Sequence, residues 1–291
     1  MHLPDFNYHQ PETIAAACEL LARYDGKARV LAGGTDVLPK MKQGLMAPEA
    51  LVSLKKIGVL STIEYIPGRG VIIGAKASPN DLYNSSLLQE KYHAVSEAAH
   101  SMANNQVRNM GSIGGNVINA VPSADLPPIL IALAATVTLE SPRGSRTMLL
   151  EDFIIGVTRT VIAPDEIMTE IILPDQSTTG SAYFKFGLRN SGALAVVGVA
   201  AAVTMQAGFT QEVRIVLGAV APIPMRSKNA EEILRGNRIS DGLIDEASKA
   251  AAAECKPISD IRASEEYRRD MVRVFTKRAL RKAIYLEEPE G

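Results

Sequence analysis

The stretch from Gln106 to Asp125, QVRNMGSIGGNVINAVPSAD, has residue types and spacing suited to binding an anion. It gathers Gly111, Gly114 and Gly115 among hydroxyl and amide side chains, and it ends at an acid. Glycine persists where the backbone must be left-handed or approach a partner closely, and consecutive free N–H groups in such a loop bind phosphate-like anions. A tight turn without a ligand remains the simpler explanation of one Gly-Gly pair, because glycine marks turns more often than sites.

Another glycine segment follows a predicted strand near the N-terminus, where ARVLA at 28–32 runs directly into GGTD at 33–36. In chain order, 33–36 is the first glycine segment and 106–125 is the second. The chain has neither GxGxxG between a strand and a helix nor GxxxxGK[ST], which excludes the two commonest nucleotide fingerprints. The two segments together would surround an anionic ligand with backbone N–H groups, the hydroxyls of Thr35 and Ser112, and the amides of Asn116 and Asn119.

The elements that must position these segments mix helix and strand. Periodicity predicts one helix that begins near Ile14 and ends at Gly26. It predicts two others over 90–103 and 126–135, with Asp125 as the N-cap of the last. Short apolar runs bounded by turn residues predict strands over 28–32, 51–54, 63–66, 71–74, 136–140 and 166–173.

Beyond a predicted linker at 177–180 the pattern changes. Strands are expected over 182–187, 194–205 and 213–220, although the alanines of the second run would also suit a helix. Helices are expected over 230–235, 241–254 and 264–285. Strands followed by helices indicate a separate α+β domain from about residue 176 onward.

The composition is that of an ordinary soluble globular protein, with 46% hydrophobic residues, 22% charged residues and a net charge of -1. A nucleic-acid surface would require a basic excess, and the basic run 268–282 is predicted to be the solvated face of a helix. Cys18 and Cys255 form no disulfide or metal signature. We expect no signal peptide and no membrane span, since the apolar run 193–205 is too short, and therefore a cytoplasmic protein.

The two glycine segments resemble those of a known family when they are taken together. VLAGGTDV at 30–37, with QVRNMGSIGGNVINAVPSADLPPILIALAA at 106–135, is similar to the FAD-binding (medium) subunit of the molybdenum hydroxylases. This family includes the medium subunits of carbon monoxide, nicotinate and xanthine dehydrogenases and the flavin domain of xanthine oxidase. DEIMTEIILP at 165–174 and FKFGLRNSGALAVVGVAAAV at 184–203 resemble later family segments, so the resemblance covers nearly the whole chain.

The resemblance implies an α+β protein with the vanillyl-alcohol-oxidase-type (PCMH-type) FAD-binding fold. In that fold, two α/β subdomains hold FAD between them, and a C-terminal domain of a three-stranded sheet and helices follows. The corresponding boundaries are 1–58 for FAD-binding subdomain 1, 59–176 for subdomain 2 and 177–291 for the C-terminal flavoprotein domain.

The same resemblance implies where FAD would bind. Residues 30–36 and 111–116 would wrap the pyrophosphate, Asp125 would accept hydrogen bonds from the adenosine ribose, and Lys185 would lie near the cofactor as a cation. Without the resemblance, Asp125 would be a helix cap and Lys185 a solvated charge. The implied cofactor-binding residues are Val30, Leu31, Ala32, Gly33, Gly34, Thr35, Asp36, Val37, Gly111, Ser112, Ile113, Gly114, Gly115, Asn116, Asn119, Asp125, Ile167, Met168 and Lys185.

Ile167 and Met168 would flank the flavin, whereas Arg108 and Asn109 would brace the second glycine segment. The histidines lie outside both segments, so FAD would be held without a covalent bond. One departure concerns Gly192, Ala193 and Leu194, which stand where the xanthine oxidase branch has a charged, acidic loop and put its pyridine-nucleotide contacts in doubt. We expect no metal and no catalytic acid or base in this chain.

The implied function is electron transfer from the [2Fe-2S] clusters of a small subunit to FAD, and on to NAD+ or another acceptor. The substrate would react in a large molybdopterin subunit, and the assembly would be a dimer of heterotrimers. Two alternatives stay open from the residues alone. One is a free-standing FAD-dependent oxidoreductase of the same fold that acts on its own small substrate, and the other is a non-catalytic nucleotide-binding or assembly protein.

Overall fold

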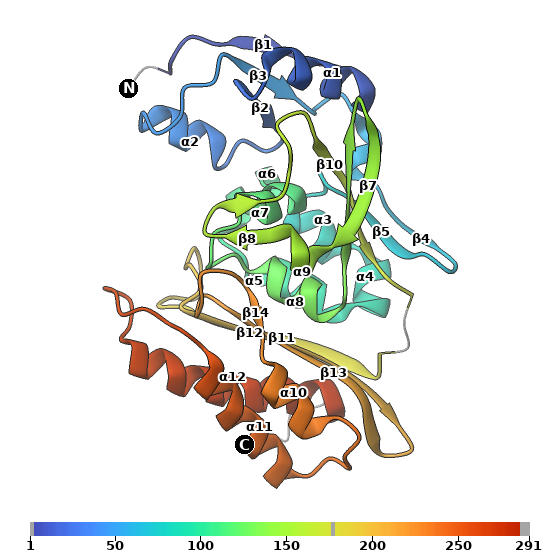
Figure 1. The fold of residues 1–291 in the computed structure, drawn as a ribbon, viewed down its shortest axis with the longest axis vertical. Coiled ribbons are helices and arrows are strands. Elements are labelled where there is room, and N and C mark those ends of the chain that lie inside the picture. Colours follow the sequence, from blue (N-terminus) through green and yellow to red (C-terminus); the bar gives the residue numbers. More distant parts are fainter. Residues whose placement is uncertain (1–2, 176–177, 286–291) are drawn as a thin grey trace.

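A computed structural model describes residues 3–175 and 178–285 of the 291-residue chain. The described chain forms three main β-sheets that follow one another down the long axis of the molecule, with helices between and outside them (Figure 1). The N-terminal layer lies at one end, and the C-terminal helices lie at the other.

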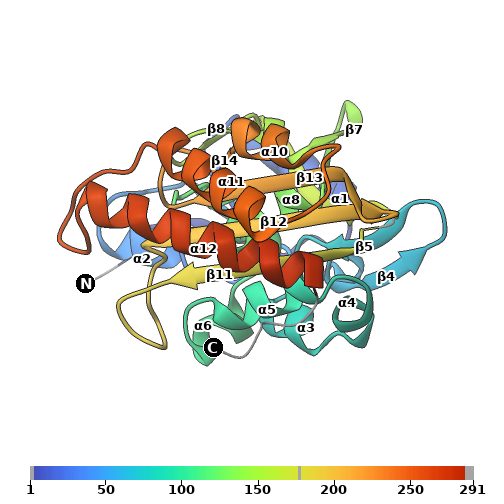
Figure 2. The same cartoon turned by 90° about the horizontal axis from the view of Figure 1, so that it is seen from below.

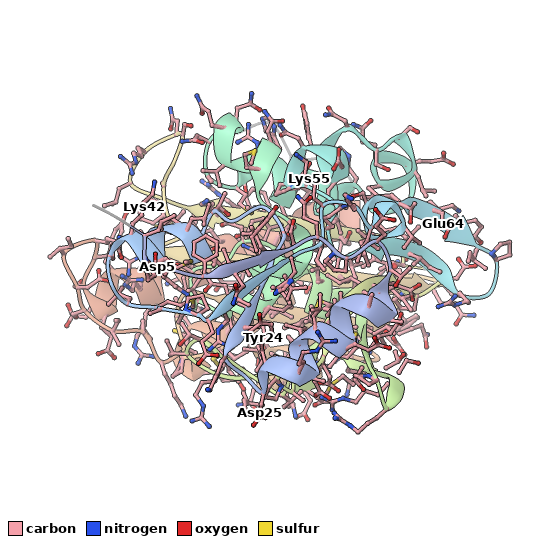
Figure 3. All side chains as sticks on the ribbon, turned by 90° about the horizontal axis from the view of Figure 1, so that it is seen from above. Asp5, Tyr24, Asp25, Lys42, Lys55 and Glu64 are labelled. Atoms are coloured by element: carbon pink, nitrogen blue, oxygen red, sulfur yellow. The ribbon has the colours of Figure 1, made fainter. Side chains whose placement is uncertain are left out.

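The N-terminal layer is a small parallel sheet of order β1-β3-β2, followed by a 3-10 turn. Its first helix is capped locally, because the Thr13 side chain accepts from the Ala16 N–H and Asp25 ends the helix in the left-handed conformation. Figure 3 shows this layer from above, with Tyr24 and Asp25 labelled at that helix end. The elements are β1 (Asn7–His9), α1 (Ile14–Tyr24), β2 (Ala28–Leu31), α2 (Val37–Lys42), β3 (Ala50–Ser53) and η1 (Gly58–Ser61).

The central part combines a five-stranded antiparallel sheet, of order β4-β5-β10-β6-β7, with a group of short helices and a two-stranded β8-β9 ribbon. Its strands are β4 (Ile63–Ile66), β5 (Gly70–Gly74), β6 (Thr136–Ser141), β7 (Gly144–Leu149), β8 (Ile154–Gly156), β9 (Arg159–Thr160) and β10 (Ile167–Leu173). Its helices are α3 (Pro79–Asn84), α4 (Ser86–Lys91), α5 (His93–Ser101), α6 (Asn105–Met110), α7 (Ile113–Asn119), α8 (Leu126–Ala132) and α9 (Leu150–Phe153).

The helix expected over 90–103 is present as α5, but it begins later than expected, because residues 90 and 91 belong to the end of α4 and the two helices meet at Tyr92. This residue leaves helical geometry, with φ -141° and ψ 52°. Its ring is buried, and its hydroxyl donates to the Pro174 carbonyl oxygen at 2.7 Å. The break between α4 and α5 therefore coincides with a hydrogen bond from Tyr92 to a residue distant in the sequence.

The C-terminal part is an antiparallel sheet of order β11-β12-β13-β14, covered on one face by the C-terminal helices and on the other by helices of the central part (Figures 1 and 2). The two residues of β14 add a fourth strand to the three that were expected. The predicted boundary at 176/177 and the start of the predicted linker lie outside the described residues. The elements are β11 (Gly180–Phe186), β12 (Val197–Gln206), β13 (Phe209–Gly218), β14 (Met225–Arg226), α10 (Lys228–Leu234), α11 (Asp241–Glu254) and α12 (Glu265–Tyr285).

The alanine-rich run is strand β12, which lies between β11 and β13 and is covered on both faces. Because side chains alternate along a strand, Ala200 and Ala202 face the central core, whereas Val199, Ala201 and Val203 join the core beneath α11 and α12. The sheet thus fastens the two parts of the molecule together through apolar contacts on both sides.

The basic run 268–282 forms the expected helix, α12, but its first arginine is not solvated. Arg268 is only 1% exposed, and it donates to the Val196 carbonyl oxygen at 2.7 Å and to Asp260 at 2.8 Å. The prediction of a solvated face is therefore wrong at this position, where the guanidinium anchors α12 to the backbone that leads into β12.

Candidate functional site

The first glycine segment leaves β2 at the carboxyl end of a parallel strand and turns into α2. Gly34 takes φ +75°, a left-handed conformation that favours glycine. Within the described part of the chain, the backbone N–H groups of Gly33, Gly34, Thr35 and Asp36 donate to no acceptor. A run of such N–H groups at this end of a strand is suited to binding an anion.

The second glycine segment is not the loop of free donors that was expected, because Ile113–Asn119 is helix α7. Ser112 is its N-cap and accepts from the Gly115 N–H at 3.1 Å. The N–H groups of Ile113 and Gly114 donate to the carbonyl oxygens of Ala77 and Ala75 at 2.9 and 2.8 Å. These donors hold the helix against the end of β5. The first glycine segment therefore offers free N–H groups, whereas the N–H groups that begin α7 are already used.

The two segments touch each other backbone to backbone. A Cβ placed on Gly33 would lie 1.6 Å from the Met110 carbonyl oxygen, so only glycine allows this approach. A Cβ on Gly115, an exposed residue, would meet only Ser112 Oγ at 2.9 Å. Glycine at 33 therefore serves the contact between the two glycine segments, whereas Gly115 borders open space.

Amide groups line the same region. Asn119 lies at the end of α7, and its amide donates to Asp36 Oδ1 at 2.8 Å across the two segments. Asn116 donates to the Met102 sulfur at 3.7 Å, whereas its Oδ1 is buried and accepts from no group in the described residues. An unsatisfied buried acceptor is costly, and it marks a place where a ligand or a water would supply a donor.

Arg108 and Asn109 brace this segment as expected. The Arg108 guanidinium donates to the Met102 carbonyl oxygen at 2.9 Å and to Asn80 Oδ1 at 3.2 Å. Asn109 accepts from the Asn80 amide at 2.6 Å. Asn80 on α3 therefore ties α6 to the neighbouring helix.

Asp125 and Lys185 form a nearly buried ion pair between α8 and β11. Lys185 Nζ lies 2.9 Å from Asp125 Oδ2 and 3.0 Å from the Ser101 carbonyl oxygen. The Tyr183 hydroxyl donates to the other carboxylate oxygen at 3.0 Å. Asp125 occupies the expected N-cap position of α8, but its side chain makes no capping bond. The alternative of a solvated Lys185 is wrong, because its side chain is only 9% exposed.

The burial of this cluster changes its acid–base behaviour. Burial raises the pKa of the Asp125 carboxyl, and the ion pair with Lys185 and the hydrogen bond from Tyr183 oppose the rise. Burial and the neighbouring carboxylate raise the pKa of Tyr183 well above its usual value. Tyr183 was missed by the sequence analysis, although its spacing of two residues from Lys185 places both on one face of a strand.

Ile167 and Met168 lie at the start of β10 and are each 2% exposed. Ile167 packs into the core of the N-terminal layer, whereas Met168 belongs to the large central core. The pair therefore joins two cores rather than lining an open surface.

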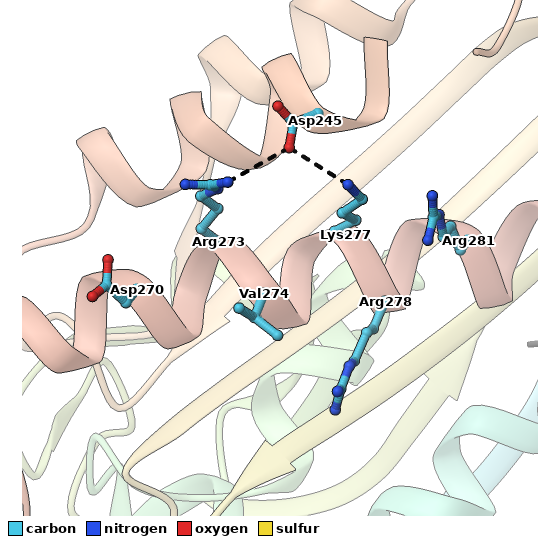
Figure 4. Close-up of a pocket in the computed structure, with 7 residues that line it drawn as sticks. All are labelled: Asp245, Asp270, Arg273, Val274, Lys277, Arg278 and Arg281. Carbon is cyan, nitrogen blue, oxygen red and sulfur yellow. Dashed lines mark ion pairs between the residues drawn. The ribbon is translucent and has the colours of Figure 1, made fainter. Parts of the chain in front are cut away.

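Two of the surface cavities among the described residues are lined by charged side chains. One, of about 290 Å³, lies beside Lys185 and is lined by Ser101 and the β11–β12 connection around Arg189. The other, of about 370 Å³, lies between α11 and α12, far from the glycine segments (Figure 4). Asp245 pairs there with Arg273 and Lys277, so much of the local charge is compensated.

No helix among the described residues is long and apolar enough to cross a membrane. The described residues also contain no group of three or more His, Cys, Asp or Glu side chains placed to hold a metal ion.

Comparisons with known proteins cover nearly all of the chain. The family model "FAD binding domain in molybdopterin dehydrogenase" matches residues 4–176, and "CO dehydrogenase flavoprotein C-terminal domain" matches residues 182–283. The carbon monoxide dehydrogenase medium chain of Hydrogenophaga pseudoflava is 35% identical over 281 residues, which are 96% of this chain and 97% of that one. The xanthine dehydrogenase FAD-binding subunit of Escherichia coli O157:H7 is 30% identical over 280 residues, 96% of each chain.

The fold is shared with solved structures as well. A carbon monoxide dehydrogenase from Hydrogenophaga pseudoflava, which lacks the Mo-pyranopterin moiety of its cofactor, superimposes with a TM-score of 0.93 at 35% identity. The match covers 98% of this chain and 99% of that chain.

Proposed function

Because this chain belongs to the FAD-binding medium subunits of the molybdenum hydroxylases, the family of the carbon monoxide and xanthine dehydrogenases, we propose that electrons leave such a complex through it. The chain is a component of an FAD-containing oxidoreductase, and FAD is its cofactor. In the proposal, electrons arrive from [2Fe-2S] clusters of a partner subunit and pass to NAD+ or another acceptor. FAD, when bound, supplies the redox chemistry, while the chain binds, orients and tunes it.

The observation that carries the proposal is the free row of N–H groups at Gly33–Asp36. A diphosphate offers acceptor oxygens to such a row, and the row lies at the carboxyl end of β2, where ligands of parallel sheets bind. The open space beside Gly115 and the unsatisfied Asn116 oxygen support a ligand in the same region. The residues present therefore fit FAD.

We propose that the diphosphate contacts residues 30–37 and the face of α7 that carries Gly115, Asn116 and Asn119. Ile113 and Gly114 are proposed to support this face of α7 indirectly, since their N–H groups already donate to the carbonyl oxygens of Ala77 and Ala75. Gly111 and Ser112 lie where the chain enters α7 and are proposed to border the diphosphate there. Ile167 and Met168, at the start of β10, are proposed to flank the flavin.

Asp125 is proposed to receive the ribose hydroxyls, with Lys185 close to the cofactor. Each carboxylate oxygen has a second lone pair, so it can accept a ligand hydroxyl while Tyr183 and Lys185 hold it. The carboxylate is thereby kept oriented before the ligand arrives, which lowers the cost of binding.

The partners proposed are a small [2Fe-2S] subunit and a large molybdopterin subunit, assembled as a dimer of heterotrimers in the cytoplasm. The domain division proposed is 1–58, 59–176 and 177–291. Substrate chemistry then belongs to another polypeptide.

Purified chain should take up FAD to about one equivalent and show a flavin absorbance band. A chain that bound adenine nucleotides but no FAD would contradict the proposal and support a nucleotide-binding protein. Co-purification with an iron–sulfur chain and a molybdopterin chain would support the partners. A stable monomer that turned over a substrate alone would instead favour a free-standing flavoenzyme.

A further inference from the structure

A lysine that no motif singled out lies between the two glycine segments. Lys40, on α2, donates from Nζ to Asn119 Oδ1 at 2.7 Å, across the boundary between the first two subdomains. Its own N–H donates to the Asp36 carbonyl oxygen at 3.1 Å, so the side chain rises one helical turn beyond the first glycine segment.

Asn119 stands between two charged groups, because its amide nitrogen donates to Asp36 Oδ1 while its oxygen accepts from Lys40. Both hydrogen-bonding ends of this amide are therefore fixed by α2. The orientation of Asn119, a proposed ligand of FAD, depends on a residue four positions past the glycine turn.

Lys40 has no carboxylate within ion-pair distance among the residues that the structure describes. The side chain is only partly exposed, and its one hydrogen-bond acceptor in this part of the chain is a neutral amide oxygen. An ammonium group has three donors, so Lys40 retains donors that no acceptor among the described residues engages, and the Asp36 carboxylate reaches it only through the Asn119 amide.

We infer that Lys40 is a binding residue for the diphosphate of FAD, an inference that rests on the function proposed above. The N–H groups of the glycine turn supply only partial charges, whereas the diphosphate carries full negative charge. Lysine is a compact point charge suited to phosphate, and Lys40 would supply the countercharge from the α2 side.

The test compares FAD with riboflavin, which has the same ring system but no phosphate. Dissociation constants for both would be measured by flavin fluorescence on the full chain and on Lys40→Met and Lys40→Gln. Methionine removes the charge and the donor, whereas glutamine keeps a donor for Asn119. Lys42→Met, one exposed lysine further along the same helix, is the matched control.

We expect both Lys40 variants to bind FAD roughly 10- to 100-fold more weakly, the range for losing a hydrogen bond to a charged group. Riboflavin affinity should be unchanged, and Lys42→Met should bind both ligands like the parent chain. The salt dependence of FAD binding should also fall in both Lys40 variants, since a charge–charge attraction has been removed.

Two results would overturn the inference. Wild-type affinity for FAD in Lys40→Met would show that Lys40 makes no contact. A loss of FAD and riboflavin alike in Lys40→Met, rescued in Lys40→Gln, would show that Lys40 only orients Asn119. Thermal unfolding of each variant identifies losses that come from misfolding, and a parent chain that bound no FAD would instead contradict the proposed function itself.

Discussion

Asp125 and Lys185 form an ion pair of 2.9 Å although only 7% of the one side chain and 9% of the other is exposed. Asp125 precedes α8 in the central part of the molecule, and Lys185 belongs to β11 of the C-terminal part. Neither charge has much access to water, so each depends on the other for compensation. The orientation of Asp125, the proposed ribose contact, therefore depends on where β11 places Lys185.

Asp125→Ala is expected to reduce the free energy of unfolding by about 3–5 kcal/mol, because the Lys185 ammonium would stay buried without a partner. Urea unfolding measures the loss. The double variant Asp125→Ala/Lys185→Met should lose less than the sum of the single variants, and strict additivity would show that the pair is not coupled. In the folded fraction, FAD binding should weaken by about 1–3 kcal/mol if ribose hydroxyls lose their acceptor.

Tyr183→Phe should reduce the free energy of unfolding by about 1–3 kcal/mol, because Asp125 Oδ1 loses a buried donor at 3.0 Å. Tyr65→Phe is the matched control, since the Tyr65 hydroxyl donates to Asp175 at 2.7 Å in an exposed setting. The control should change stability by less than about 0.5 kcal/mol. Equal effects in the two variants would contradict the special role of the buried contact.

Gly33→Ala should destabilise the fold by about 3 kcal/mol or more, above the usual cost of overpacking, because its Cβ would meet the Met110 carbonyl oxygen at 1.6 Å. Gly58→Ala, with nothing within 4 Å, should be nearly neutral. Thermal or urea unfolding compares the two. A stable Gly33→Ala variant would mean that the two glycine segments separate easily.

Gly115→Val should instead leave the chain folded, because only Ser112 Oγ lies near the new side chain. Its branched side chain would occupy the space proposed for the diphosphate, and bound flavin should fall roughly tenfold or more. Flavin absorbance per protein measures this loss. Full FAD occupancy would exclude Gly115 from the face of α7 proposed to contact the diphosphate.

The stability of the chain should fall at acid pH partly through Asp260. Hydrogen bonds from Arg262, with a further one from Arg268, hold the pKa of Asp260 well below its usual range. The unfolded chain therefore binds a proton near pH 4, roughly the ordinary aspartate pKa, before the folded chain does. By linkage, the contribution of this carboxylate is fully present above that pH and is lost as the pH falls below it.

Asp260→Asn isolates this contribution. The difference in free energy of unfolding between parent and variant should be largest at pH 6–7, about one unit or more above the range in which aspartate titrates, and should shrink on acidification. Urea unfolding across this range measures the difference. A difference that does not change with pH would show that Asp260 acts only through its shape and neutral hydrogen bonds.

Local sequence signals were sufficient where the decisive contacts are local. Thr13 caps the start of α1 with its side chain, and Asp25 ends the helix in the left-handed conformation. The strands expected over 63–66 and 71–74 pair as β4 and β5. The strand β12 was ambiguous, because alanine suits a helix as well as a strand and only burial between β11 and β13 decides between them.

The sequence by itself determined that two glycine segments exist, that mixed α/β parts precede a C-terminal α+β part, and which family the chain resembles. Only the tertiary structure decided which glycine segment keeps free N–H groups, because the carbonyl groups of Ala75 and Ala77, in the connection between β5 and α3, engage the N–H groups that begin α7. It also decided that Asp125 faces Tyr183 and Lys185 instead of capping α8, and that Lys40 reaches Asn119. Hydrogen-bond partners so distant in the chain leave no periodic signal, since they are selected by how the packed elements meet.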